Sequence, residues 1–140
     1  MGAEFRAGEG GGGEVRLVLT AAEVEALGPD AVVMAELLDS CFWALGMLRT
    51  GRNTRDPGGG APVPGDWVAA VRGLDRLPPR VRAVVDAVLR EYAAGPGQVR
   101  HLAAALGVDE AEVRARAGRP RDAWEEWAGG GTSGGRHRGV

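Results

Sequence analysis

Apolar residues recur at helical spacing along most of the chain. One stripe lies between residues 30 and 48: Met34, Leu37, Leu38, Cys41, Leu45 and Leu48. A second stripe lies between residues 79 and 92: Val81, Val84, Val85, Val88, Leu89 and Tyr92. Shorter helices are predicted over residues 21–27, 67–74, 98–106 and 109–117, and a last amphipathic turn or two is predicted over residues 121–128. The pattern predicts an all-α protein, a small domain of five or six helices.

Only residues 14–19 have the character of a strand, because they are rich in β-branched side chains and partly alternate. Thr20 and Glu23 follow with the spacing of a capping box, which predicts that a helix begins at residue 21. The sequence therefore predicts one short N-terminal strand with no evident partner in its own chain.

Glycine-rich runs divide the chain. Because glycine loses the most backbone entropy on ordering, the runs at 7–13 and 129–135 predict flexible tails over residues 1–13 and 129–140. A Gly/Pro-rich loop over residues 50–65 separates the strand and helices of 14–49 from a helical region of 66–128. The predicted core contains Leu37, Leu38, Cys41, Leu45, Val81, Val84, Val85, Val88, Leu102, Leu106 and Val113.

Charge is spread unevenly around a net value of −2. Residues 74–121 carry 9 Arg against 6 acids, whereas residues 1–73 carry 6 Arg against 10 acids. A mildly basic segment is compatible with a nucleic-acid partner. All 17 cationic residues are Arg, a composition typical of a genome rich in G and C, as in actinobacteria. The absence of Lys excludes a P-loop lysine and a Schiff-base lysine.

Catalytic patterns are missing. The single cysteine, Cys41, permits no intrachain disulfide, and no His, Cys and carboxylate group has metal-ligand spacing. We therefore expect no enzyme activity, no cofactor and no metal. Residues 31–48 are apolar but contain Glu36 and Asp39, which disfavours a membrane span. The N-terminus lacks a signal pattern, so a cytoplasmic location is expected.

Residues 98–118 have the pattern of a helix-turn-helix. Ala103 provides the small residue that two crossing helices need, and Gly107 provides the turn residue that tolerates a positive φ. Four apolar side chains are placed to pack the two helices together: Leu102, Leu106, Val108 and Val113.

The run Leu-Gly-Val-Asp-Glu-Ala-Glu-Val-Arg-Ala-Arg at 106–116 resembles the C-terminal DNA-binding region, region 4, of bacterial sigma factors and of related response regulators. The run Leu-Pro-Pro-Arg-Val-Arg-Ala-Val-Val at 77–85 is similar to the opening of the same region. The resemblance covers residues 74–119 and implies transcription regulation through double-stranded DNA.

The chain departs from that family's pattern in three places. The link between the two matching stretches, through residues 95–97, is longer than the usual one in the family. Ala117 stands where the family has a large apolar side chain. The second helix opens with Asp109, Glu110 and Glu112, which repel phosphates. The N-terminal half shows no counterpart of the promoter-melting region of sigma factors, so the resemblance implies a lone DNA-reading module or a relic of one.

Two functions remain open. The first is a small DNA-binding regulator, with Arg114 expected on a base, Arg100, Arg119 and Arg121 on phosphates, and Glu110 and Arg116 beside them. The second is a non-catalytic helical module for self-association or protein binding. Its partner interface would consist of Val32, Trp43 and Met47, and its partner would be a second copy in a homodimer or another protein. Simpler structural roles stand beside both. Glu110–Arg114 and Glu112–Arg116 have the spacing of ordinary surface pairs, and Trp43 can pack beneath the helix that carries Trp67.

Overall fold

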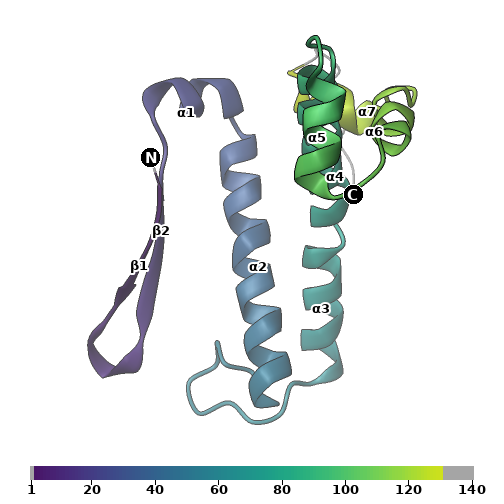
Figure 1. Cartoon of the computed structure of the whole chain (residues 1–140). Helices are drawn as coiled ribbons and strands as arrows, with labels where there is room; N and C mark the ends of the chain where they lie inside the picture. Colours follow the sequence, from purple (N-terminus) through teal and green to yellow (C-terminus); the bar gives the residue numbers. More distant parts are fainter. Residues whose placement is uncertain (1, 131–140) are drawn as a thin grey trace.

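The helices predicted from the apolar spacing are present in the computed structural model, which describes residues 2–130. The all-helical class is confirmed. The elements follow in the order β1 (Gly2–Ala7), the 3-10 turn η1 (Glu9–Gly11), β2 (Gly13–Val18), α1 (Ala21–Leu27), α2 (Asp30–Thr50), α3 (Pro64–Leu74), α4 (Leu77–Ala93), α5 (Gln98–Leu106), α6 (Glu110–Ala117) and α7 (Ala123–Ala128). Figure 1 shows α2 beside α3, with α4 to α7 gathered at one end and the strands on the far side of α2.

The N-terminal segment differs from its prediction. Residues 2–7, expected within a disordered tail, form β1 and pair antiparallel with β2, so the predicted strand has a partner in its own chain. The reversal is possible because Gly10 and Gly11 adopt φ of 72° and 83°, a region that glycine enters without steric cost. The glycine run therefore forms the turn of a hairpin. Most of the other predicted tail, residues 131–140, lies outside the described residues.

Thr20 and Glu23 begin α1 in the way that their spacing predicted. The Glu23 backbone N–H donates to the Thr20 hydroxyl at 3.1 Å, and the Thr20 N–H donates to the Glu23 carboxylate at 2.8 Å. These reciprocal bonds satisfy two of the backbone donors that a helix start leaves free.

The N-terminal core lies between α2 and α3, where Ala44, Met47 and Ala70 are buried and Trp43 and Leu74 pack against them. The helices approach closely at Gly73, since a Cβ there would stand 2.7 Å from the Ser40 hydroxyl. The Gly/Pro-rich loop lies back on α2. Its Asn53 accepts a hydrogen bond from the Trp43 indole at 3.0 Å, and its Arg55 pairs with Asp39 at 2.8 Å.

Much of the predicted core is exposed. Leu37 and Val113 are buried as expected, and Cys41 and Leu102 are half-buried. The other predicted members are solvent-exposed: Leu38, Leu45, Val81, Val84, Val85, Val88 and Leu106. On α4 the buried residues are Ala83 and Leu89 instead. Of the apolar stripe predicted on α4, Leu89 is buried against α5 and α6, whereas its four valines remain exposed.

Helix α2 is covered on one side only. Among residues 2–130 it is the one helix that is long and apolar enough to cross a membrane by length and composition. Only 17% of that apolar stretch is buried. A helix that is apolar around most of its circumference favours cover on more than one face, so α2 has apolar surface available for a partner.

Candidate nucleic-acid interface

Helices α4, α5 and α6 share a small core around three buried side chains. Leu89 of α4, Ala103 of α5 and Val113 of α6 form this cluster, and half-buried Leu102 and Val108 pack at its edge. The predicted roles of Ala103 and Val113 in joining the two helices are confirmed. Leu106, predicted to join them, is exposed, and the third buried side chain of the cluster is Leu89 of α4.

Gly107 makes the turn between α5 and α6. Its φ is 66°, and its backbone N–H donates back to the last turn of α5. The N–H of Val108 donates to the Ala103 carbonyl at 3.0 Å. These bonds satisfy carbonyls that the helix end would leave free and fix the direction in which α6 departs. The predicted left-handed turn is confirmed.

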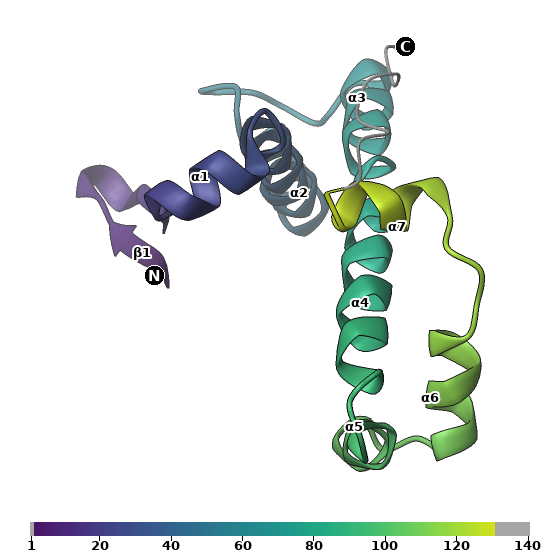
Figure 2. The same cartoon turned by 90° about the horizontal axis from the view of Figure 1, so that it is seen from above.

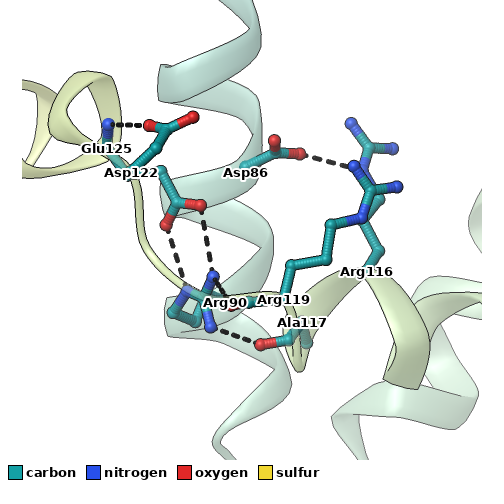
Figure 3. A network of polar contacts seen from close by, with 7 residues as sticks. All are labelled: Asp86, Arg90, Arg116, Ala117, Arg119, Asp122 and Glu125. Atoms are coloured by element: carbon teal, nitrogen blue, oxygen red, sulfur yellow. Dashed lines mark hydrogen bonds and ion pairs between the residues drawn. The ribbon is translucent and has the colours of Figure 1, made fainter.

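Arg90 ties the end of α6 and the start of α7 to α4 (Figure 3). Its guanidinium pairs with the Glu125 carboxylate through two bonds, from Nε to Oε2 at 3.1 Å and from Nη2 to Oε1 at 3.2 Å. It also donates to the backbone carbonyls of Ala117 and Arg119. The Glu125 side chain is only 8% exposed and that of Arg90 only 19%.

This role of Arg90 could not be predicted from the sequence, because the residue also fits an ordinary surface pair with Asp86, four positions earlier. The only local signal was Asp122, which caps α7 by accepting a hydrogen bond from the Glu125 N–H at 2.9 Å. That cap predicts where α7 starts. It does not predict which distant cation meets Glu125.

The Arg116 side chain points toward α4 and not toward the exposed side of α6, where DNA was expected. Its Nε donates to the Asp86 carboxylate of α4 at 2.9 Å, and both side chains are partly buried. The alternative surface pair with Glu112 is not the one formed. Arg116, predicted among the DNA contacts, thus has a packing role that joins α6 to α4.

Arg114 faces solvent on the outer side of α6. It pairs with Glu110 one turn earlier at 3.0 Å, the surface pair that the spacing predicted. Its side chain is 63% exposed, so the guanidinium is accessible despite this pair. Exposed ion pairs of this kind contribute only about 0.3–0.5 kcal/mol, and a stronger acceptor can displace Glu110.

The three predicted phosphate contacts are exposed as well. Arg100 lies in the first turn of α5, and Arg119 and Arg121 lie in the segment that joins α6 to α7. The backbone at Arg119 is held by the bond from Arg90, whereas its side chain is exposed. Of the six residues predicted to contact DNA, four are thus exposed arginines on or beside α5 and α6.

Helix α7 lies across α4 near its start (Figure 2) and presents two indoles to Arg80. The Arg80 guanidinium carbon lies 4.7 Å from the Trp124 ring centre and 5.7 Å from that of Trp127. Burial lowers the pKa of Arg80 from its ordinary value, Arg76 lowers it further, and Asp30 opposes both. The Trp127 indole donates to Asp30 at 3.1 Å, which joins α7 to the start of α2.

Two of the three residues predicted for the partner interface have contacts within the chain itself. Met47 is fully buried between α2 and α3, and half-buried Trp43 bonds to Asn53. Only Val32 is exposed. Because α2 is apolar around most of its circumference, the sequence did not indicate which of its faces meets α3. Trp43 packs against α3, as the alternative structural role predicted.

Within residues 2–130, no cluster of three or more His, Cys, Asp or Glu side chains could hold a metal ion. An open cleft of about 750 Å³ lies between α4 and α7, with Arg90, Tyr92, Gln98 and Arg121 in its walls. The Tyr92 hydroxyl and His101 Nδ1 are 2.6 Å apart, and both side chains are exposed. Comparison with protein families, with curated proteins and with solved structures found no match to this chain.

Proposed function

We propose that this chain is a small DNA-binding regulator of the helix-turn-helix type. The observation that carries the proposal is the packing of α5 and α6 on α4 through Ala103, Val113 and Leu89, with a left-handed Gly107 in the turn. This arrangement holds α6 by its inner side and leaves its outer side exposed, as a recognition helix requires.

The dimensions of α6 suit the major groove of B-form DNA. An α-helix with its side chains is about 10–12 Å across, which fits a groove about 12 Å wide, and the 8 residues of α6 give it a length of about 12 Å. Arg114 stands on the exposed side, and a guanidinium that reaches a guanine edge can form two parallel bonds to it. Glu110 offers an acceptor to the amino group of a cytosine. The Glu110–Arg114 pair would therefore open on binding and contact neighbouring bases.

The exposed arginines beside this helix supply the phosphate contacts. Arg100 approaches the backbone from α5, and Arg119 and Arg121 approach it from the segment after α6. The acidic start of α6, with Asp109 and Glu112, repels phosphates, so that end of the helix faces base edges or solvent.

A titration of a labelled duplex, followed by fluorescence anisotropy, tests the proposal. With three phosphate contacts, the logarithm of the association constant should fall with the logarithm of salt at a slope of about −2.7. Replacing Arg119 and Arg121 by Ala should reduce the slope by about 2. Arg72→Ala on α3 is the matched control and should leave the slope unchanged. No binding to any duplex, even in a random-sequence pool at about 50 mM salt, would remove the proposal.

A further inference from the structure

The open cleft on α4 is bounded by the start of α5 and by α7. Its volume of about 750 Å³ is within the range of small-molecule sites, about 300–1,000 Å³. The apolar part of its wall consists of Ala87, Val88 and the ring of Tyr92, all on α4. The Tyr92 hydroxyl is 2.6 Å from His101 Nδ1, and this contact restrains the ring. The cleft thus has the size and the apolar wall that a small organic molecule requires.

Two of the charged side chains in the wall neutralise each other. Arg90 and Glu125 are joined by two bonds, at 3.1 Å and 3.2 Å. Arg90 also donates to the carbonyls of Ala117 and Arg119 (Figure 3). Because both groups are engaged within the chain, this part of the wall is held in place and offers no net charge to a ligand.

Two other charged side chains in the wall are exposed and opposite in sign. Arg121 lies in the segment between α6 and α7, and Glu91 lies near the end of α4. Neither side chain forms a hydrogen bond or an ion pair with another residue of the described range, 2–130. Gln98, half-buried at the start of α5, adds an amide that can donate or accept. The cleft therefore presents one available cation, one available anion and one amide beside an apolar wall.

We propose that this cleft binds a small zwitterion with an apolar body, namely a free amino acid with an apolar side chain. The ligand carboxylate pairs with the Arg121 guanidinium, which can bind a carboxylate through two parallel bonds. The ligand ammonium group pairs with Glu91, and the ligand side chain lies on Val88 and the Tyr92 ring. A phosphate or a dicarboxylate fits this wall less well, because Glu91 repels the second negative charge.

Titration of the isotope-labelled full chain, followed by the amide chemical shifts in NMR spectra, tests this inference with three probes. L-phenylalanine carries both charges, N-acetyl-L-phenylalanine lacks the ammonium group, and phenethylamine lacks the carboxylate. Phenylalanine should shift the amide signals of Glu91, Gln98 and Arg121 in a saturable way. It should also bind at least about 10-fold more tightly than either analogue, because each analogue loses one charge-assisted contact.

Two variants assign the two charges of the ligand. Arg121→Ala should weaken phenylalanine about 10-fold without weakening phenethylamine, which has no carboxylate to lose a partner. Glu91→Gln should weaken phenylalanine without weakening N-acetyl-phenylalanine, which has no ammonium group. The matched controls are Arg82→Ala and Glu36→Gln, because both residues are exposed and lie outside the cleft wall. These controls should bind phenylalanine as wild type does.

Three results would overturn the inference: no saturable shift with phenylalanine up to about 20 mM, equal affinity for phenylalanine and either analogue, or an equal loss of binding in the control variants. The amide spectrum of each variant also reports whether it is folded, and all four substituted positions are exposed. Arg121 is also a proposed phosphate contact. Because the titration contains no DNA, failure here is distinct from failure to bind a duplex.

Discussion

Arg90 and Glu125, which are 35 positions apart, form a partly buried two-bond ion pair that joins α4 to α7. The same guanidinium bonds to the carbonyls of Ala117 and Arg119. One side chain therefore fixes the end of α6, the following segment and the start of α7. The orientation of the proposed DNA-binding surface depends on this residue, although Arg90 itself faces inward.

Replacing Arg90 by Ala should lower the free energy of unfolding by about 3–5 kcal/mol, because the Glu125 carboxylate would remain buried without a counter-charge. Urea denaturation followed by circular dichroism measures the change. Arg114→Ala, which removes an exposed partner only, should change stability by less than about 0.5 kcal/mol. A loss of under about 1 kcal/mol for Arg90→Ala would show that the pair has little structural importance.

Gly107→Ala should destabilise the protein by about 1–2 kcal/mol, because an alanine at a φ of 66° clashes with its own backbone. Gly60→Ala is the control, since Gly60 has open space around its Cβ position and no left-handed conformation. That substitution should stay within about 0.5 kcal/mol of wild type. Equal effects of the two changes in thermal unfolding would contradict the proposed role of the turn.

Met47→Ala should lower the free energy of unfolding by about 2–5 kcal/mol, as expected when a fully buried side chain leaves a cavity. Val32→Ala on the same helix should be nearly neutral, because Val32 is exposed. The comparison separates packing from partner binding on α2. A Met47→Ala variant with wild-type stability would mean that Met47 is not enclosed between α2 and α3.

Local patterns predicted the boundaries of several elements well. The Thr20–Glu23 spacing predicted the start of α1, and Gly107 predicted the turn before α6, since both signals act within a few residues. The sequence could not indicate which side of α4 its neighbours would cover. The four valines of the stripe are exposed, whereas Ala83 and Leu89 are buried and Arg90 supplies the bonds to α6 and α7. Contacts between distant residues decided that choice, and periodicity does not report them.

The hairpin was missed for a related reason. Residues 2–7 contain few β-branched or aromatic side chains, so their own propensity for a strand is weak. Pairing with residues 13–18 places Phe5 beside Val15 and matches the charges on the other face. The cross-strand partners, rather than the segment alone, stabilise the strand.

The two arginines of α6 should respond in opposite ways to substitution. Arg114 is exposed and linked only to Glu110, so Arg114→Ala should leave stability unchanged while weakening duplex binding by about 1–3 kcal/mol for the loss of a base contact. Arg116 is partly buried and linked to Asp86, so Arg116→Ala should cost about 1–3 kcal/mol of stability by leaving that carboxylate without its partner. At a temperature where both variants are folded, Arg116→Ala should bind duplex DNA almost as wild type does. Anisotropy titration and urea denaturation on the same samples measure both quantities. If Arg114→Ala binds as wild type while Arg116→Ala loses binding in its folded form, the exposed side of α6 is not the surface that meets DNA.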